Sequence, residues 1–339
     1  MTEHKIAVLG AGSWGTALAN VAAENGHNVM LWTYKESQVP EINELHTNAQ
    51  YLGDNPLHHG VIATADMKTA VDGAELVLSV VPTKVTRQVV KHLAQVLVEL
   101  NQSPIVMAAT KGLEPETYLR VSEVLSEEIP AKYRRGLGVI SGPSHAEGVI
   151  KHDPTLVTAV SENLAIAQAV QGLMTNSDFR MYTGTDVIGA EIGGALKNVI
   201  AIGAGALETL GYDANAKAAL FTRGLAEIGR LGQAYGANPI TFMGLSGMGD
   251  LFVTATSVHS RNYRAGQQLG EGKSLAQIEA DMGMIIEGIS TTKVAHEIAQ
   301  AKHVDMPITD MIYEVLYNDK DIKLSVCELM GRPTHQEGN

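Results

Sequence analysis

The chain has 339 residues, 45% of them apolar, so it is long enough to bury a large core and to form about two domains. Its 37 acidic and 25 basic residues give a net charge of −12, which excludes general binding to nucleic acids or acidic membranes because the protein's field repels polyanions. The single cysteine, Cys327, excludes an internal disulfide framework and is typical of a reducing compartment.

The start of the chain, MTEHKIAVLGAG, has an apolar run of only four residues before its glycines, which is shorter than the core of a secretory signal. The longest uninterrupted apolar runs, from Val199 and from Leu76, fall well short of the roughly 20 residues that span a bilayer. We therefore expect a cytoplasmic chain with no membrane insertion. The pair His58 and His59 lacks the spacing of metal-binding motifs, so no metal site is expected.

Short apolar runs alternate with helical patterns over the first half of the chain. Several of these runs are continuously apolar, as strands buried on both faces are. We expect helices over residues 83–100 and 116–129, and strands over residues 5–10, 28–33, 60–64, 75–81, 104–110, 136–141, 155–160 and 179–183. This alternation predicts an α/β fold with a doubly wound, mostly parallel sheet.

The strand pattern stops near residue 185, and the remainder is typical of helices separated by glycine, proline and capping residues. The expected helices cover residues 186–210, 214–235, 261–270, 274–283, 290–302, 308–318 and 321–330. We therefore expect a dinucleotide-binding domain over residues 1–185 and an all-helical substrate domain over residues 186–339.

The first strand leads into the sequence GAGSWG, which places Gly10, Gly12 and Gly15 in the G-x-G-x-x-G spacing before a helix. The first glycine permits a tight turn, the second lets the backbone approach a pyrophosphate, and the third lets the helix pack closely on the strand. Free N–H groups at the start of the helix then face the phosphates. The motif in this context predicts a dinucleotide site.

The end of the second strand bears on which nicotinamide cofactor binds. NAD-specific sites usually carry Asp or Glu there to hold the ribose 2′-hydroxyl. This chain has Thr33, Tyr34 and Lys35 in that region, and Glu36 follows one residue later. A cation and the absence of an acidic residue at the strand end favour NADPH. NADH stays possible, because strand ends are predicted only to within a few residues and Glu36 could then lie at the strand end.

A lysine and an asparagine, Lys197 and Asn198, stand in the middle of the apolar stretch EIGGALKNVIAIGAGAL. The neighbours of Lys197 three and four positions away are glycine, isoleucine and alanine, so no carboxylate can pair with it along the helix. Its charge partner must come from elsewhere in the fold. The alternative is a lysine that extends from a core helix to solvent.

Six segments together carry a family resemblance: GAGSWGTALA, ATKGLE, ISGPS, GGALKNVIAIGAG, GLSGMGDL and SRN. In this order, over nearly the whole chain, they resemble the bacterial NAD(P)-dependent glycerol-3-phosphate dehydrogenases. The resemblance implies an N-terminal Rossmann domain, a helical domain like the C-terminal domain of 6-phosphogluconate dehydrogenase, and a homodimer. It also implies reversible reduction of dihydroxyacetone phosphate to sn-glycerol 3-phosphate, a precursor of phospholipids.

The resemblance implies roles for individual residues. The catalytic positions are Lys197, Asp250 and Lys111. The substrate contacts are Lys111, Gly142, Ser144, Lys197, Asn198, Asp250, Thr254, Ser260, Arg261 and Asn262. The cofactor contacts are Gly10, Gly12, Ser13, Trp14, Gly15, Tyr34, Lys111, Ala146, Arg261, Ile285 and Glu287. Ser144 and His145 stand where the family often has Thr and Phe, and Tyr34 stands where it often has His or Arg.

Elementary chemistry agrees with these roles. Hydride arrival at a ketone creates an alkoxide, and a protonated lysine can neutralise it as a general acid. Lys197 would be that acid, Asp250 its charge partner, and Arg261 a planar fork for the substrate phosphate. We also expect the glycines beside Lys197 to leave room for ligands along the helix.

Two other functions fit parts of the pattern. A related Rossmann dehydrogenase could act on a hydroxyacyl or sugar-acid substrate with His145 as its acid and base. A nucleotide-sensing regulator could bind NADPH without turnover, and it would need neither Lys197 nor Asp250.

Overall fold

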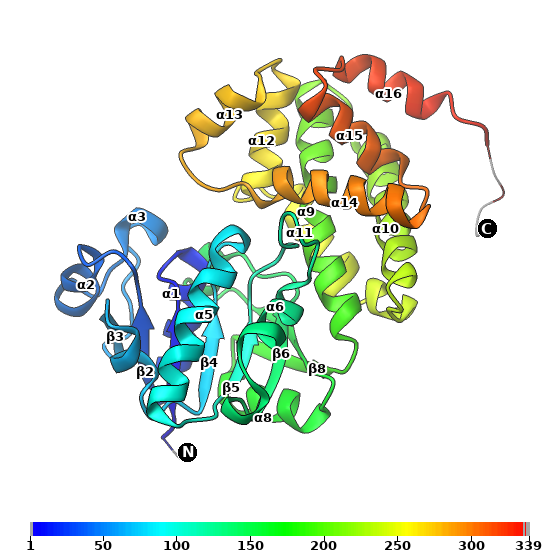
Figure 1. The fold of residues 1–339 in the computed structure, drawn as a ribbon. Helices are drawn as coiled ribbons and strands as arrows, with labels where there is room; N and C mark the ends of the chain where they lie inside the picture. Colours follow the sequence, from blue (N-terminus) through cyan, green and yellow to red (C-terminus); the bar gives the residue numbers. More distant parts are fainter. Residues whose placement is uncertain (1–2, 335, 337–339) are drawn as a thin grey trace.

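The computed structural model describes residues 3–334 and 336, which form an α/β domain and a helical domain (Figure 1). The α/β domain contains one sheet of eight strands in the order β3-β2-β1-β4-β5-β6-β7-β8. The strands are β1 (Lys5–Leu9), β2 (Asn28–Trp32), β3 (Val61–Thr64), β4 (Leu76–Ser79), β5 (Ile105–Ala108), β6 (Gly136–Ser141), β7 (Thr155–Val160) and β8 (Phe179–Gly184). All neighbours pair in parallel except β6 and β7, so the expected mostly parallel sheet is confirmed.

Helices cover both faces of the sheet because both faces are apolar. Along β1, Ile6 and Val8 join one buried cluster, while Ala7 and Leu9 join a second cluster on the opposite face. The helices of this domain are α1 (Ser13–Glu24), α2 (Gln38–Pro40), α3 (Ala49–Leu52), α4 (Met67–Val71), α5 (Thr83–Leu100), α6 (Val121–Glu128), α7 (Ala146–Val149) and α8 (Leu164–Met174). Short turns of other helix types lie at Glu41–Leu45 and Ala131–Tyr133. The doubly wound arrangement thus follows from strands that are buried on both sides.

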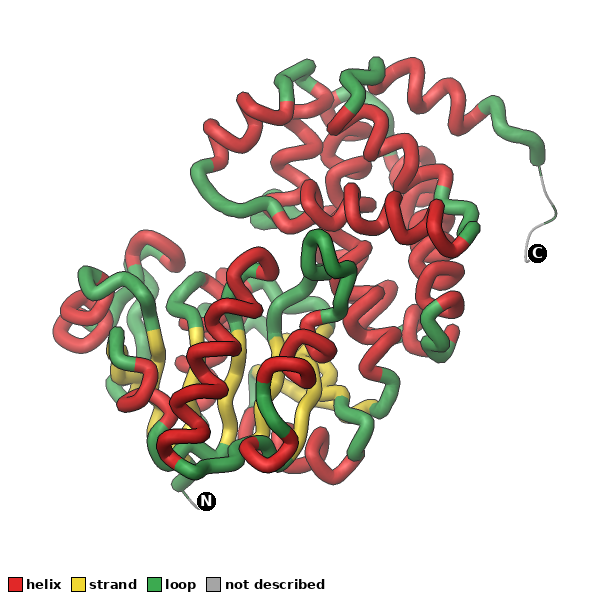
Figure 2. Tube along the Cα trace, viewed as in Figure 1, coloured by secondary structure: helices red, strands yellow, loops and turns green. Residues whose placement is uncertain are grey.

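Over its described residues the second domain is formed only by helices and loops, and it lies beside the strand-containing layer (Figure 2). Its helices are α9 (Val187–Thr209), α10 (Ala214–Ala234), α11 (Asp250–Thr256), α12 (Arg261–Gly270), α13 (Leu275–Met282), α14 (Glu287–Lys302), α15 (Pro307–Tyr317) and α16 (Ile322–Met330). The short turns η3 (Pro239–Met243) and η4 (Leu245–Gly249) precede α11. The seven helices expected from the sequence are present, and α11 is an eighth that the sequence analysis missed. The expected start of the helix at residue 116 is also wrong, since α6 begins only at Val121.

Helix α9 is the centre of the helical domain, and α10, α11, α12 and α14 pack against it. Among the described residues, it is the one helix with the length and mean hydropathy that would allow a membrane crossing, and 89% of its most apolar window is buried inside the protein. The polar residues Glu191, Lys197 and Asn198 keep its uninterrupted apolar runs short. Because its apolar side chains already contact α10, α12 and α14, its composition is explained by its place in the core.

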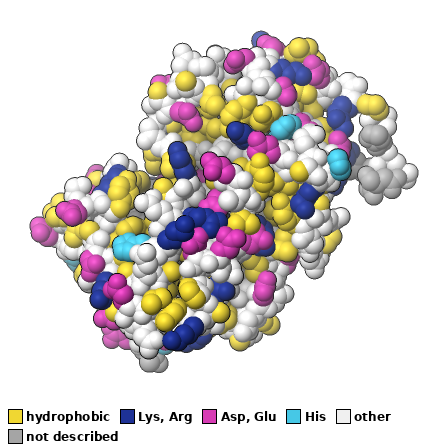
Figure 3. Space-filling view, in the orientation of Figure 1, with side chains coloured by type: hydrophobic (Ala, Val, Ile, Leu, Met, Phe, Trp, Pro, Cys, Tyr) yellow, Lys and Arg dark blue, Asp and Glu magenta, His cyan; other side chains and the backbone are white. Residues whose placement is uncertain are grey.

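The surface in one view carries acidic and basic side chains over both domains, and they gather most densely over α5 and α6 (Figure 3). Arg87 of α5 contacts three carboxylates, those of Glu114, Glu127 and Glu128. The segment that joins β5 to α6 passes beside this group and reaches the helical domain, where Leu113 is buried in the core. The two domains are therefore tied together by this segment as well as by the chain that joins β8 to α9.

Candidate active site

The glycine-rich turn follows β1 and begins α1. Gly10 has a φ of +117°, and a Cβ at this position would lie 2.8 Å from the carbonyl oxygen of Val80. A Cβ on Gly15 would lie 1.9 Å from the carbonyl oxygen of Gly10, so only glycine lets α1 start so close to the strand. Apart from its two neighbours in the chain, no residue has an atom within 4 Å of a Cβ built on Gly12. This open space at the start of a 12-residue helix fits a dinucleotide pyrophosphate.

Side chains from the segment after β2 hold this turn in place. Gln38 and Asn48 are buried and both donate to the carbonyl oxygen of Ala11, at 3.3 and 3.1 Å. Ser13 donates through Oγ to the carbonyl oxygen of Tyr51 at 3.1 Å. The predicted cofactor residue Ser13 is therefore joined to the same segment that follows the end of β2.

The end of β2 presents an aromatic and a cationic side chain to solvent. Tyr34 is 75% exposed, and the Lys35 ammonium donates to the Tyr51 hydroxyl at 3.3 Å. This hydrogen bond is the main cause of a raised Lys35 pKa, so the group stays charged at neutral pH. Glu36 is exposed and forms no part of β2.

Lys197 does not extend to solvent from the middle of α9. Its residue is 6% exposed, and its Nζ donates to Asp250 Oδ1 at 2.5 Å and to Thr254 Oγ1 at 2.7 Å. Both acceptors belong to α11, the helix that sequence analysis missed. The charge partner expected from elsewhere in the fold is thus Asp250, and the alternative of a solvated lysine is wrong.

A second lysine contacts the same carboxylate from the α/β domain. Lys111 follows β5, and its Nζ lies 2.8 Å from Asp250 Oδ2 and donates to the Gly142 carbonyl oxygen at 2.8 Å. Gly142 follows β6, so parallel pairing of β5 and β6 brings both segments to the carboxyl edge of the sheet. Ser144 also donates to the Gly142 carbonyl oxygen, at 3.0 Å. Asp250 is fully buried and links the two domains through two ammonium groups.

Burial and neighbouring charges set the protonation of this cluster. Burial lowers the pKa of Lys197 to about 8; Asp250 opposes this change, and the positive charge of Lys111 adds to it. Burial alone would raise the pKa of Asp250, but Lys111 and Lys197 outweigh it and leave the pKa below its ordinary value. The carboxylate is therefore ionised at neutral pH, while Lys197 is protonated at neutral pH and deprotonated in mild base.

A second polar group lies where α9, α12 and α14 meet. Asn262 donates to the side-chain oxygen of Asn198 at 2.8 Å, and the Gly288 amide donates to Asn262 Oδ1 at 2.8 Å. Ser260 caps α12 by accepting the Tyr263 amide. Arg261 is the first residue of α12, and it is exposed and donates to the Ile285 carbonyl oxygen at 2.9 Å. The structure thus joins Asn198 and Asn262 by a buried hydrogen bond, with the cap Ser260 and the exposed Arg261 at the start of the same helix.

The predicted cofactor residue Glu287 is half-buried at the start of α14. It accepts the Thr83 amide at 3.1 Å, across the domain boundary, and burial raises its pKa. A Cβ on Gly112 would lie 2.3 Å from the Thr83 hydroxyl oxygen and 3.1 Å from Glu287 Oε2. Thr83 is not among the residues predicted from the sequence, although its place just after β4 at the carboxyl edge could have indicated it.

The remaining predicted residues lie at the edges of this region. Ala146 is buried at the start of α7, and Trp14 packs near Phe179 with ring centroids 6.3 Å apart. His145 does not cap α7 with its side chain. Instead its Nε2 lies 3.1 Å from the Val253 carbonyl oxygen on α11, and since a carbonyl only accepts, the ring must donate.

The expectation that glycines beside Lys197 leave room for ligands is wrong at two positions. A Cβ on Gly193 would lie 2.3 Å from the Ser246 carbonyl oxygen, so this glycine lets η4 approach α9. A Cβ on Gly194 would lie 3.2 Å from Ser141 Oγ and 3.5 Å from Lys111 Cγ. These glycines allow close packing of protein around Lys197. Among the described residues, no three His, Cys, Asp or Glu side chains form a metal-binding group.

Comparison with known proteins identifies the family. Residues 5–167 match the family described as NAD-dependent glycerol-3-phosphate dehydrogenase N-terminus, and residues 186–326 match that of the C-terminus. The chain is 59% identical over 337 residues to "Glycerol-3-phosphate dehydrogenase [NAD(P)+]" of Ligilactobacillus salivarius, with 99% of each chain covered. It is 57% identical over 333 residues to the protein of the same name from Limosilactobacillus fermentum, with 98% and 99% covered.

A solved structure agrees with this result. The glycerol-3-phosphate dehydrogenase of Coxiella burnetii superposes with a TM-score of 0.91 at 36% identity and covers 97% of this chain and 99% of its own. The two family matches and the full-length relatives show that the chain belongs to the NAD(P)-dependent glycerol-3-phosphate dehydrogenases.

Proposed function

We propose that this chain catalyses the reversible NAD(P)H-dependent reduction of dihydroxyacetone phosphate to sn-glycerol 3-phosphate, a precursor of glycerophospholipids. The observation that carries the proposal is the buried carboxylate of Asp250 between the ammonium groups of Lys197 and Lys111. Such a cluster is costly to bury, and its position at the carboxyl edge of a doubly wound sheet is where these folds bind ligands. The nicotinamide cofactor, when bound, supplies the hydride for the C2 carbonyl.

Lys197 is the proposed general acid in the reducing direction. Its protonated Nζ neutralises the alkoxide that forms at C2, and the neutral amine takes the proton back in the reverse reaction. Asp250 holds the ammonium group through Oδ1, and Thr254 fixes its direction. Lys111 and Asn198 are proposed to orient the carbonyl and hydroxyl oxygens of the substrate.

Arg261 is the proposed ligand of the substrate phosphate. It is exposed at the first position of α12, where a planar guanidinium and the start of a helix both favour an anion. Ser260 and Asn262 flank it and are buried, so their positions are fixed by the fold. A local cationic site of this kind accounts for an anionic substrate on a protein with a net charge of −12.

The rival assignment of His145 as the acid and base has weaker support. Its Nε2 hydrogen points to a backbone carbonyl oxygen, and burial followed by the charges of Lys197 and Lys111 lowers its pKa. A histidine in this state holds α11 in place more readily than it donates a proton. We therefore favour Lys197 over His145 in the catalytic role.

Three further features of the proposal are a boundary between the domains at residues 185 and 186, a homodimer and a cytoplasmic location. The boundary agrees with the end of β8 at Gly184 and the start of α9 at Val187. The homodimer rests on the family resemblance, and sedimentation equilibrium would distinguish it from a single 36.1 kDa chain.

The pH dependence of turnover tests Lys197 directly. Since the acid must carry its proton, kcat for reduction should be constant below about pH 8 and fall above it, and the oxidation rate should rise over the same range. Lys197→Met should lower kcat by about 10³-fold and remove this pH dependence. NAD(P)H oxidation followed at 340 nm gives both rates, with the exposed Lys293→Met on α14 as control. A folded Lys197→Met enzyme that keeps most of its turnover would refute the role.

Replacing Arg261 tests the phosphate site. Arg261→Ala should raise the KM for dihydroxyacetone phosphate by about 30-fold and leave activity on unphosphorylated dihydroxyacetone nearly unchanged, because only the charge-assisted contact is lost. The KM of Arg261→Lys should lie between those of the wild type and Arg261→Ala, since lysine keeps the charge but lacks the planar fork. Arg264→Ala, one turn further along the exposed face of α12, is the matched control. An unchanged KM in Arg261→Ala would remove this residue from the phosphate site.

The preference for NADPH depends on Lys35 in this proposal. Lys35→Met should lower kcat/KM for NADPH by about fivefold and that for NADH much less, because only NADPH carries the 2′-phosphate. Steady-state rates with each cofactor measure the ratio, and Lys68→Met on α4, which pairs with Glu99, is the control. A wild-type enzyme at least about tenfold more efficient with NADH would contradict the NADPH preference.

A further inference from the structure

The segment from Gly112 to Arg120, here called the 112–120 loop, directly follows Lys111 and is held by its own backbone. The Glu114 amide donates to the Leu119 carbonyl oxygen at 2.8 Å, and the Tyr118 amide donates to the Glu114 carbonyl oxygen at 3.0 Å. Leu113 and Arg120 form an antiparallel bridge across its base. Glu116 and Tyr118 have φ values of 72° and 61°, a conformation that non-glycine residues keep only when their surroundings enforce it.

Both ends of the 112–120 loop are fixed to the helical domain. Leu113 is 2% exposed and packs in the same core as the side chains of α9. Arg120 donates to Glu191 of α9 at 2.7 Å, and Glu191 also accepts the Ser122 amide at 2.8 Å. These contacts join the start of α6 to α9 near the turn that carries Lys197.

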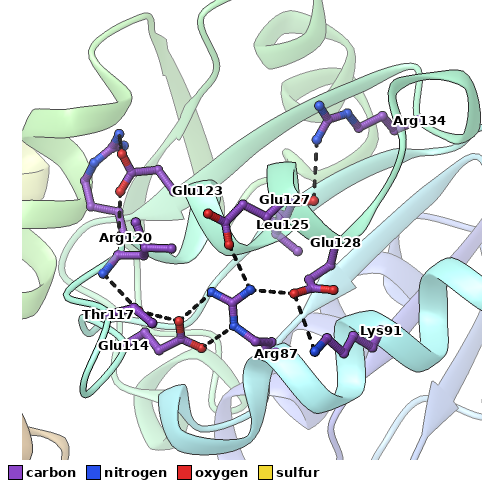
Figure 4. Close-up of polar contacts among 11 residues, drawn as sticks. Arg87, Lys91, Glu114, Thr117, Arg120, Glu123, Leu125, Glu127, Glu128 and Arg134 are labelled. Atoms are coloured by element: carbon purple, nitrogen blue, oxygen red, sulfur yellow. Dashed lines mark hydrogen bonds and ion pairs between the residues drawn. The ribbon is translucent and has the colours of Figure 1, made fainter.

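The middle of the loop is held from the other side by one arginine (Figure 4). Arg87 of α5 forms a fork on Glu114, with Nε 2.9 Å from Oε1 and Nη2 2.6 Å from Oε2. Its third nitrogen, Nη1, contacts Glu127 and Glu128 of α6 at 2.8 and 2.5 Å. The Thr117 hydroxyl adds a bond of 2.5 Å to Glu114. Arg87 and Glu114 are half-buried, so this contact is less screened than a fully exposed surface pair.

We propose that Arg87 and Glu114 are positioning residues that fix the 112–120 loop and thereby hold the ammonium group of Lys111 against Asp250. This inference rests on the proposed catalytic function of the lysine cluster. Glu114 is three residues from Lys111, and the intervening Gly112 is packed against Thr83 and Glu287. The backbone between Glu114 and Lys111 therefore has little freedom to move, and the position of Glu114 determines that of Lys111. Neither Arg87 nor Glu114 contacts the reacting atoms; both act through Lys111.

The loop position changes the electrostatics of Lys197. The charged or titratable groups facing Lys197 are Asp250 of α11, Lys111 after β5, and His145 before α7. While Lys111 stays close, its positive charge lowers the pKa of Lys197 and it shares the carboxylate of Asp250. When the loop moves outward, Asp250 neutralises Lys197 alone, and the pKa of Lys197 rises.

Glu114→Gln and Arg87→Met test the proposal in the full-length enzyme. Each variant should lower kcat/KM for dihydroxyacetone phosphate by about tenfold, because misplacement of a catalytic group by a fraction of an ångström is costly. Each should also move the alkaline fall of kcat to higher pH by about half a unit. The double variant should match the single ones, since both residues act through one contact. The kcat/KM of Arg87→Lys should lie between those of Arg87→Met and the wild type, because lysine lacks the planar fork.

Arg134→Met is the matched control, because Arg134 bonds to Leu125 and Ser126 of α6 but does not touch the loop (Figure 4). It should leave both the rate and the pH dependence unchanged. Unchanged values in Glu114→Gln, or effects of the two substitutions that simply add, would overturn the inference. If Arg87→Met fails to fold, Glu114→Gln alone decides, since it keeps the size of the side chain and removes its charge and one acceptor oxygen.

Failure of this inference is distinguishable from failure of the proposed function. Lys111→Met and Lys197→Met are measured in the same assay. If both lysine variants lose activity while Glu114→Gln behaves as wild type, only the role of the loop is wrong. If the lysine variants keep activity, the catalytic assignment itself is wrong, and the positioning role is overturned with it.

Discussion

One buried carboxylate between two ammonium groups is the interaction on which the rest of the site depends. Asp250 has no exposed surface, and its two oxygens contact Lys197 and Lys111 at 2.5 and 2.8 Å. Removing such ions from water costs on the order of several kcal/mol for each charge, so the contact persists only if the fold brings all three groups together accurately. The two ammonium groups and the one carboxylate together carry a net charge of +1. This positive charge favours the developing alkoxide and an anionic substrate.

The fold meets this requirement by bringing three separate segments to one point. Parallel strands place Lys111 at the carboxyl edge of the sheet, α9 supplies Lys197 from the centre of the helical domain, and α11 supplies Asp250. The glycine at position 193 lets η4 approach α9 so closely that α11 begins within reach of Lys197. Small residues along α9 thus serve the packing around the charged group.

Much of this arrangement could be predicted from the sequence, because periodicity and motif spacing are local properties. The eight strands and seven of the helices of the helical domain follow from apolar patterns, and the glycine-rich turn follows from its motif spacing. The lack of a carboxylate near Lys197 along the helix indicated a distant partner. Two features could not be predicted in this way. Helix α11 begins in a glycine-dense stretch of low helix propensity, and it is stabilised by contacts with α9 that only the tertiary structure supplies. The 112–120 loop is ordered by Arg87 and Glu191, which are distant in sequence.

The pH dependence of ketone reduction by an Asp250→Asn variant tests the central claim most directly. Asparagine keeps the shape of the side chain but removes the charge that raises the pKa of Lys197, while Lys111 continues to lower it. We predict a folded enzyme whose kcat falls at a pH at least about one unit lower than in the wild type, with much reduced turnover at pH 7. An unchanged pH dependence in this variant would show that the buried ion cluster does not control the proton of the reaction.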